Sequence, residues 1–227
     1  MHGTFGSQSI QIEPAILYLG TPVVVIGSTN EDGTYNLAPM SSAWWLGWRC
    51  MLGLSAISKT TENIIRTGEC VLNLPSADLV GEVDRLARTT GSDPVPETKA
   101  RRGYRHVKDK FAVSGLSAWR GETVAAPRVA ECPVQLEAKV THLHGIAEDD
   151  ETWRGKSFAI EVRVTRVHAH PNIMMDGEPN RIDPDKWRPL IMSFQQFYGL
   201  TADKLQRSEL GQIPEQLYKP PGWQPAP

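Results

Sequence analysis

The stretch from Leu54 to Gly68 constrains this chain most, because an apolar run passes through hydroxyl residues directly into a helical pattern. Its first half predicts the end of a buried strand. Its second half predicts a short helix, with Ile64 and Ile65 on the apolar side and Gly68 where a left-handed residue ends a helix. Such a junction directs backbone N–H groups, hydroxyls and the ammonium of Lys59 at one point, which is the composition of a phosphate site.

The same stretch has a plainer interpretation. Thr60 could cap the helix while Lys59 lies in solvent. The stretch alone does not decide between a phosphate site and an ordinary helix start, so the evidence must come from the neighbouring segments.

The segment before this stretch predicts a hairpin. Residues 21–29 are rich in β-branched side chains, residues 30–33 form a turn, and residues 34–40 form the return strand. Pro39 has no backbone N–H, so we expect broken pairing and an edge or bulge over residues 38–42. Unpaired backbone groups there would be available to a ligand.

Apolar and alternating runs elsewhere predict further strands. They span residues 50–58, 69–74, 134–144, 157–170 and 190–198. A helix is predicted from Ser76 to about Arg88. Hairpin connections, two short helices and the absence of repeats predict a mainly β chain with one antiparallel barrel, in a single domain over residues 1–227.

Residues 90–127 form a long excursion with little apolar content, in which we expect only a turn of helix near residues 96–102. Loops of this length are usually functional or ordered by a partner. Its seven basic residues between Lys99 and Lys110 either form a solvated loop or guide an anionic dinucleotide toward a site. Residues 200–227 predict an extended tail, with proline-rich residues from Pro214 onward.

Composition excludes several classes of function. The net charge of −2 gives no general attraction to nucleic acid or anionic membranes, and no apolar run approaches the roughly 20 residues that span a bilayer. The N-terminus has no basic segment followed by an apolar one, so no secretory signal is expected. Cys50, Cys70 and Cys132 are far apart among apolar neighbours, which predicts reduced thiols in a cytoplasmic protein.

Familiar nucleotide and hydrolase motifs are missing from the sequence: it has no Gly-x-Gly-x-x-Gly, no Gly-x-x-x-x-Gly-Lys and no Gly-x-Ser-x-Gly. Two His-x-His pairs, His142/His144 and His168/His170, place two imidazoles on one strand face and leave a metal-binding barrel as a remote alternative. Histidines at strand ends are otherwise unremarkable.

Three tryptophans, Trp44, Trp45 and Trp48, fall within five residues. They could stack on a planar ligand, fill a core or cover a subunit interface, and we favour core or interface for at least two of them.

An ordered set of motifs resembles a known family. The Asn-x-Ala-Pro-x-Ser-Ser segment of residues 36–42 precedes the Ser-x-x-Ser-Lys-Thr-Thr-x-Asn segment of residues 55–63, and Val-Leu-Asn-Leu-Pro follows at residues 71–75. Together they resemble the flavin reductase-like, FMN-binding split-barrel family, which includes nitrilotriacetate monooxygenase component B. The likeness covers residues 16–75 and returns at residues 127–139 and 181–199. It implies a split β-barrel of Greek-key type with short helices.

The resemblance also implies that FMN is the cofactor and assigns residues to it. Those along the isoalloxazine edge would be Asn36, Ala38, Pro39, Met40, Ser41 and Ser42. Those at the phosphate would be Ser55, Ser58, Lys59 and Thr60, with Asn63 supporting the turn. A phosphate dianion takes several donors and one cation, which agrees with this set. No catalytic side chain is expected, since the flavin carries the chemistry.

The function implied by the resemblance is NAD(P)H-dependent flavin reduction by a homodimer, with reduced flavin supplied to a partner monooxygenase. Many such reductases have a histidine near the start of the penultimate long strand that is thought to meet the nicotinamide nucleotide, where this chain has Ser157 and Phe158. The alternative is therefore an FMN-binding electron-transfer protein of the same fold.

Overall fold

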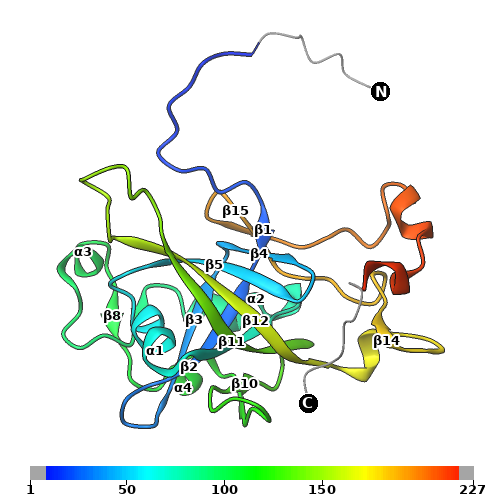
Figure 1. The fold of residues 1–227 in the computed structure, drawn as a ribbon, viewed down its shortest axis with the longest axis horizontal. Helices are drawn as coiled ribbons and strands as arrows, with labels where there is room; N and C mark the ends of the chain where they lie inside the picture. Colours follow the sequence, from blue (N-terminus) through cyan, green and yellow to red (C-terminus); the bar gives the residue numbers. More distant parts are fainter. Residues whose placement is uncertain (1–8, 220–227) are drawn as a thin grey trace.

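The structure is a computed structural model that describes residues 9–219, and a seven-stranded antiparallel sheet forms its framework (Figure 1). The strand order is β3-β2-β6-β11-β12-β5-β4. The strands are β2 (Val24–Thr29), β3 (Tyr35–Met40), β4 (Ala43–Leu46), β5 (Arg49–Ser55), β6 (Glu69–Leu74), β11 (Val134–Gly145) and β12 (Ser157–Ala169). The sequence predicted each of these segments except β4.

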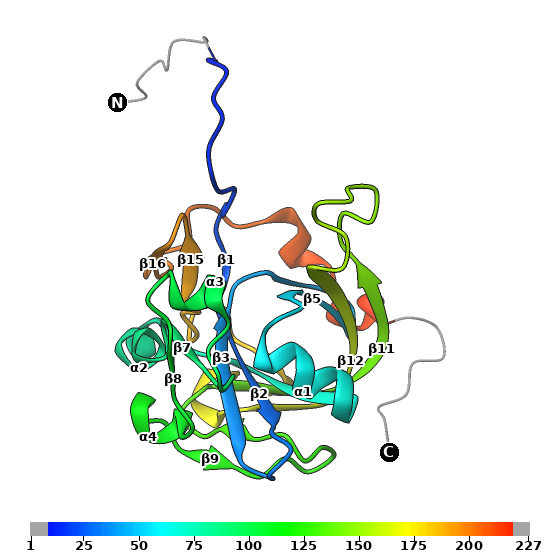
Figure 2. The ribbon, with the colours of Figure 1, turned by 90° about the vertical axis from the view of Figure 1, so that its left-hand side faces the viewer.

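The two edges of this sheet are consecutive in the chain. Strands β3 and β4 lie at opposite ends of the strand order, yet only Ser41 and Ser42 separate them. Three peptide units reach at most about 11 Å, so the sheet curls until its edges meet (Figure 2). The N–H of Gly53 donates to the carbonyl of Ser42 at 2.7 Å at this meeting point. No ladder of hydrogen bonds joins β3 to β4 within residues 9–219, so the sheet stays open along this line.

The core occupies the concave face of the curled sheet. Alternate residues of a strand face opposite sides, and Val24 and Ile26 of β2 accordingly join a buried cluster with Leu52, Leu72 and Ile160. The residues that alternate with these along the strands point to the convex face and form a second buried cluster there. It includes Val25, Leu37, Val83, Leu86 and Leu190. The second cluster fixes the segment after β6 against β2 and β3.

Helix α1 (Lys59–Thr67) follows β5 as expected, and Gly68 ends it in a left-handed conformation with φ of 72°. The cap differs from the plainer interpretation, because Ser58 and not Thr60 is the N-cap, and its side chain accepts from the N–H of Thr61 at 3.0 Å. Helix capping places Lys59 in the first helical turn.

The helix predicted from Ser76 to Arg88 is shorter than expected. It consists of a 3-10 turn, η1 (Ala77–Leu79), and α2 (Val80–Arg85). Arg88 has a positive φ of 51°, which no helix accommodates, so the chain turns away before the predicted end.

The long excursion contains more regular structure than the sequence indicated. Helix α3 (Glu97–Ala100) matches the expected turn, but α4 (Lys110–Ser114), capped by Asp109, was missed. The short strand β7 (Thr89–Thr90) pairs in parallel with β8 (Arg105–His106), and β9 (Ala118–Trp119) pairs with β10 (Arg128–Val129). These pairings fold the excursion on itself, in two small sheets separate from the seven-stranded one.

Two further predictions need correction. Pro39 does not interrupt pairing, because β3 pairs with β2 through Met40 and Pro39 lies opposite Val25; the edge position, however, is confirmed. Residues 190–198 form a hairpin and not one strand, because Phe194 and Gln195 turn the chain at positive φ. The hairpin strands are β15 (Ile191–Ser193) and β16 (Gln196–Tyr198), and β15 pairs with β1 (Thr21–Pro22).

The rest of the C-terminal part is mostly exposed. Two short strands, β13 (Met174–Met175) and β14 (Glu178–Ile182), and three 3-10 turns, η2 (Pro171–Ile173), η3 (Glu209–Gln212) and η4 (Glu215–Tyr218), complete the described elements. Residues 220–227 of the predicted tail lie outside the described residues. None of the helices in residues 9–219 has the length and apolar character to cross a bilayer.

Candidate functional site

A cavity of about 1180 Å³ lies where the two edges of the curled sheet meet. Its walls come from β3, the Ser41–Ser42 link, the end of β5 and the start of α1 on one side. The segment after α2, the basic part of the long excursion and the link between β11 and β12 supply the other side. The opening of the sheet is therefore the place where a ligand can contact backbone and hydroxyl groups together.

The structure brings ten of the eleven predicted site residues to this cavity. They are Asn36, Ala38, Pro39, Met40, Ser41, Ser42, Ser55, Ser58, Lys59 and Thr60. Asn63 does not line it. Its buried amide donates to Ser28 Oγ at 3.1 Å and to Asn30 Oδ1 at 2.8 Å, so Asn63 holds α1 against the β2–β3 hairpin.

The start of α1 presents donors to the cavity. The first intrahelical bond runs from the N–H of Glu62 to the carbonyl of Ser58, so the N–H groups of Lys59 and Thr60 point out of the helix end. Asn36 Nδ2 donates to Thr60 Oγ1 at 3.1 Å and orients that hydroxyl. Backbone N–H groups, hydroxyls and the positive end of the helix dipole therefore converge on one side of the cavity.

Lys59 is neither in open solvent nor without a partner. Its Nζ lies 2.5 Å from Glu62 Oε1, and its side chain is 20% exposed, whereas that of Glu62 is 53% exposed. An ion pair with an exposed carboxylate contributes little, about 0–1 kcal/mol, and Glu62 does not line the cavity. The ammonium can therefore exchange this partner for an anionic ligand at small cost.

The far wall of the cavity is basic. Besides Lys59, its lining includes Arg88, Lys99, Arg102 and Lys110, and the one carboxylate among the described lining residues is Asp84. Burial, together with Lys99 and Arg105 nearby, lowers the pKa of Lys110 to about 8. Burial and the neighbouring Arg102 also lower the pKa of Lys99. The basic side chains on this wall favour an anionic ligand.

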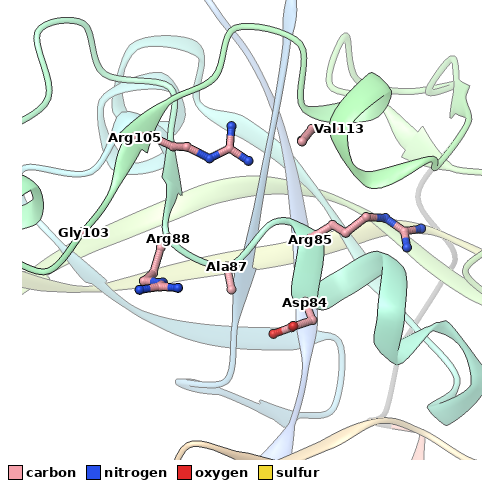
Figure 3. Close-up of a pocket in the computed structure, with 7 residues that line it drawn as sticks. All are labelled: Asp84, Arg85, Ala87, Arg88, Gly103, Arg105 and Val113. Atoms are coloured by element: carbon pink, nitrogen blue, oxygen red, sulfur yellow. The ribbon is translucent and has the colours of Figure 1, made fainter.

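A second, smaller hollow of about 530 Å³ adjoins this wall (Figure 3). It shares Asp84, Ala87 and Arg88 with the main cavity and adds Arg85 and Arg105. Arg85 is already occupied, because it donates to the carbonyl of Ser114 at 2.8 Å and pairs with Glu82 at 2.7 Å. The hollow extends the positive surface around the loop after α2.

The sequence predicts the basic run as a solvated loop or a guide for an anionic dinucleotide, and not as a wall of the same cavity as the phosphate site. The missed residues on the cavity wall include Arg88, Thr89, Thr90, Gly91, Tyr104 and Lys110. The signal that could have found Lys110 was Asp109, a helix-capping residue followed by Lys-Phe, with Gly115 at the helix end. That signal predicts helix α4, whereas the burial of Lys110 comes from the packing of α4 against α2 and β3.

The histidine pairs serve as structural contacts. His142 and His144 stack with ring centroids 5.7 Å apart and lie about 4 Å from Glu161, which also binds Arg49. His168 contacts Glu137 and His170 contacts the carbonyl of Ala130. Over residues 9–219, no three His, Cys, Asp or Glu side chains are arranged to hold a metal ion.

Aromatic and thiol side chains also have clear positions. Trp45 and Trp48 are partly buried and pack against the core, whereas Trp44 is 58% exposed. Cys50, Cys70 and Cys132 are unpaired and buried, and burial raises the pKa of the Cys50 thiol to about 12. These thiols are therefore packing residues and poor nucleophiles.

Comparison with known proteins places this geometry in context. The family model described as "Flavin reductase like domain" matches residues 17–201. An uncharacterized protein of Bacillus subtilis, YdfE, is 39% identical over 202 residues, which cover 88% of this chain and 94% of that protein.

Two solved structures show the same fold at low sequence identity. Flavoredoxin of Desulfovibrio vulgaris matches with a TM-score of 0.69 at 20% identity, over 89% of this chain and all of that chain. Nitrilotriacetate monooxygenase component B from Bacillus cereus matches with a TM-score of 0.69 at 16% identity, over 88% of this chain and 99% of that one.

Proposed function

The chain belongs to the flavin reductase-like family, and from that premise we propose that it is an FMN-binding, NAD(P)H-dependent flavin reductase. Membership makes it a flavin oxidoreductase. The choice of FMN, the nicotinamide co-substrate and the residues of the site are our proposals. The curled sheet, open between β3 and β4, is proposed to be the split barrel of Greek-key type that the sequence resemblance implied.

The observation that carries the proposal is the convergence of donors at the start of α1. Ser55, Ser58, Lys59 and Thr60 line one side of the cavity, where the helix end offers two free N–H groups. A phosphate monoester carries close to two negative charges at neutral pH and needs several donors and a cation. We assign the phosphate of FMN to this position, with Lys59 as the point charge and Asn63 as a support for the helix.

The ring system is assigned to the wall formed by residues 38–42. This wall is the sheet edge, where no strand of residues 9–219 lies beside the outer side of β3. Edge N–H and carbonyl groups can pair with the polar rim of an isoalloxazine, and the hydroxyls of Ser41 and Ser42 add further donors. When bound, the flavin supplies the hydride and electron-transfer chemistry.

The chain's own residues then bind the flavin, orient its ring and stabilise its negative charge. The cavity of about 1180 Å³ exceeds the usual 300–1,000 Å³ of a single-ligand pocket, which supports room for a second ring beside the flavin. Donors near the pyrimidine end of the ring would stabilise a reduced, anionic flavin. No acid or base is required from a side chain.

Assembly and compartment are further parts of the proposal. Trp44 and Leu46 are exposed on edge strand β4, beside the open line of the sheet, and support a homodimer in which a second chain covers this edge. The three reduced cysteines support a cytoplasmic protein. A partner monooxygenase would receive reduced flavin, in line with the family resemblance.

The test compares FMN with riboflavin, which lacks the phosphate. Lys59→Met should weaken FMN binding about 10-fold or more and leave riboflavin binding within about twofold. Lys139→Met is the matched control, because Lys139 is exposed on β11 and does not line the cavity. Equal losses for both ligands would contradict the phosphate assignment.

The second candidate is an FMN-binding electron-transfer protein. The observation that favours it is Ser157 on the cavity wall and Phe158 packed against the core, at the position where many reductases carry a histidine. A steady-state assay separates the two candidates: an electron-transfer protein would bind FMN yet oxidise NADH or NADPH no faster than free flavin does.

A further inference from the structure

Lys110 is a charged side chain in an unusual position. It is 2% exposed, and its Nζ donates to Thr89 Oγ1 at 2.5 Å. No carboxylate in the described part of the chain forms an ion pair with it. Burying an ammonium without a counter-charge is costly, so a lysine is usually found buried only with a partner. One hydroxyl satisfies one of its three donors.

The surroundings of Lys110 add positive charge and do not supply the missing anion. Lys99 and Arg105 lie close enough to lower its pKa. Arg88 also lines the cavity, and its guanidinium has no hydrogen bond or ion pair with another residue in 9–219. Lys99, Arg105 and the buried ammonium of Lys110 repel one another, so the protein alone leaves this wall electrostatically incomplete.

An aromatic platform stands beside these cations. Tyr104 lines the same cavity, with Lys99 Nζ 5.9 Å and Arg102 Cζ 5.8 Å from its ring centroid. Bases stack on aromatic rings and on guanidinium planes, and such stacking contributes about 1–3 kcal/mol per base. An anion site beside a stacking ring is the pattern of a nucleotide.

This wall is distinct from the proposed flavin phosphate site. Lys110 is joined to Thr89, whereas Gly91, two residues further along, lies against Lys59 and Asn36. The two lysines therefore contact different residues of the segment that follows α2, Thr89 for Lys110 and Gly91 for Lys59. The cavity offers more volume and more positive charge than one mononucleotide needs.

We propose that Lys110, Lys99, Arg102 and Tyr104 form a second subsite in this cavity, which binds the adenosine diphosphate part of a dinucleotide. Lys110 takes a phosphoryl oxygen of the diphosphate, Lys99 and Arg102 take the remaining charge, and Tyr104 stacks on the base. The inference rests on the proposed function, because it assumes that the cavity holds nucleotides. Two dinucleotides carry this group: a flavin dinucleotide and the nicotinamide co-substrate.

The first test uses the full chain with ADP as the probe and adenosine beside it, measured by titration calorimetry. Lys110→Met should weaken ADP binding about 10-fold or more and leave adenosine binding within about twofold. The matched control is Lys108→Met. Lys108 lies two residues away, is 70% exposed and pairs with Asp32, so its loss should leave ADP binding unchanged.

A second variant keeps the test valid where Lys110→Met fails to fold. Lys99→Ala combined with Arg102→Ala changes side chains outside the core and should also weaken ADP binding. Tyr104→Ala should weaken adenosine and ADP alike, because it removes the stacking surface. Absence of ADP binding to the wild-type protein, or equal ADP binding by wild type and both variants, would overturn the proposal.

Two further comparisons distinguish the two subsites from each other and the flavin dinucleotide from the nicotinamide dinucleotide. If Lys59→Met and not Lys110→Met abolishes ADP binding, ADP occupies the flavin phosphate site and the second subsite is wrong. If the wild-type protein binds ADP but not FMN, the proposed flavin site is wrong and the second subsite is not. A flavin dinucleotide is the occupant if FAD binds more tightly than FMN and Lys110→Met removes the difference. The nicotinamide dinucleotide is the occupant if ADP competes with it in steady-state assays.

Discussion

His168 Nε2 donates a 2.8 Å hydrogen bond to Oε1 of Glu137, a carboxylate with no exposed surface. The same carboxylate accepts from the N–H groups of Glu122 and Thr123 at 2.8 and 2.6 Å and from the Thr123 hydroxyl at 2.6 Å. Glu137 lies in β11, so these bonds attach the end of the long excursion to the central sheet.

The Glu137 network predicts a pH-dependent contribution to stability. Burial alone would raise the pKa of Glu137, but the hydrogen bonds from Glu122, Thr123 and His168 outweigh it and lower the pKa to about 2. Because the folded-state pKa lies below the unfolded value of 4.5, the contribution is complete above pH 4.5 and is lost as the pH falls toward 2.

The measurement is urea unfolding of wild type and Glu137→Gln across pH 7 to 3. The variant should lose about 1–3 kcal/mol of unfolding free energy at pH 7, since its neutral amide accepts more weakly and leaves a buried donor short of a partner. The difference from wild type should shrink as the pH falls below 4.5. A difference that stays constant with pH would contradict this account of Glu137.

Glu62→Gln tests whether the Lys59 ion pair competes with a ligand phosphate. Removing the carboxylate frees Lys59, whose Nζ lies 2.5 Å from Glu62 Oε1. We expect FMN to bind about 2- to 5-fold more tightly, because an exposed pair costs only about 0–1 kcal/mol to break. Riboflavin binding should not change. Tighter binding of both flavins would indicate a change in the ring site instead.

Gly91 sets the distance between the excursion and the start of α1. A Cβ at this position would lie 2.7 Å from Asn36 Oδ1 and 3.0 Å from Lys59 Cγ, so Gly91→Ala must displace one wall of the cavity. We expect FMN binding to weaken by about 10-fold, since a misplaced donor set loses most of its hydrogen-bond energy. Calorimetric titration measures the loss.

Gly81→Ala is the control for Gly91→Ala. Gly81 lies in α2, where an added Cβ would come no closer than 3.8 Å to Arg85. Its FMN affinity should equal that of wild type. Unchanged FMN binding in Gly91→Ala would show that this contact does not shape the site.

The sequence predicted the local elements of the site well because their signals are local. Gly68 at the end of α1 follows from capping preferences, although the helix is capped by Ser58 and not by Thr60, and the β2–β3 hairpin follows from its turn residues. Each of these features depends only on residues that are close together in the sequence.

The missed features depend on contacts that are distant in the chain. Lys110 is noticeable as one of seven basic residues, but its burial depends on Thr89 and on the packing of α4 against α2 and β3. Pro39 likewise predicted a break, whereas an edge strand tolerates a missing donor on its open side. The burial of Lys110 and the intact pairing at Pro39 both depend on tertiary position, which the local sequence does not predict.

Trp44 provides the test of subunit assembly. It lies on edge strand β4 beside Leu46, and the two side chains are 58% and 76% exposed, so a second chain could cover both and remove the unpaired edge from solvent. Trp44→Lys places a charge at the centre of that surface and should convert a dimer to a monomer in sedimentation or light-scattering measurements.

Trp119→Lys is the control, because Trp119 is 49% exposed on the distant strand β9. If Trp44→Lys remains dimeric while Trp119→Lys dissociates, the interface lies on the excursion and not on β4. A monomeric wild-type chain would contradict the proposed dimer.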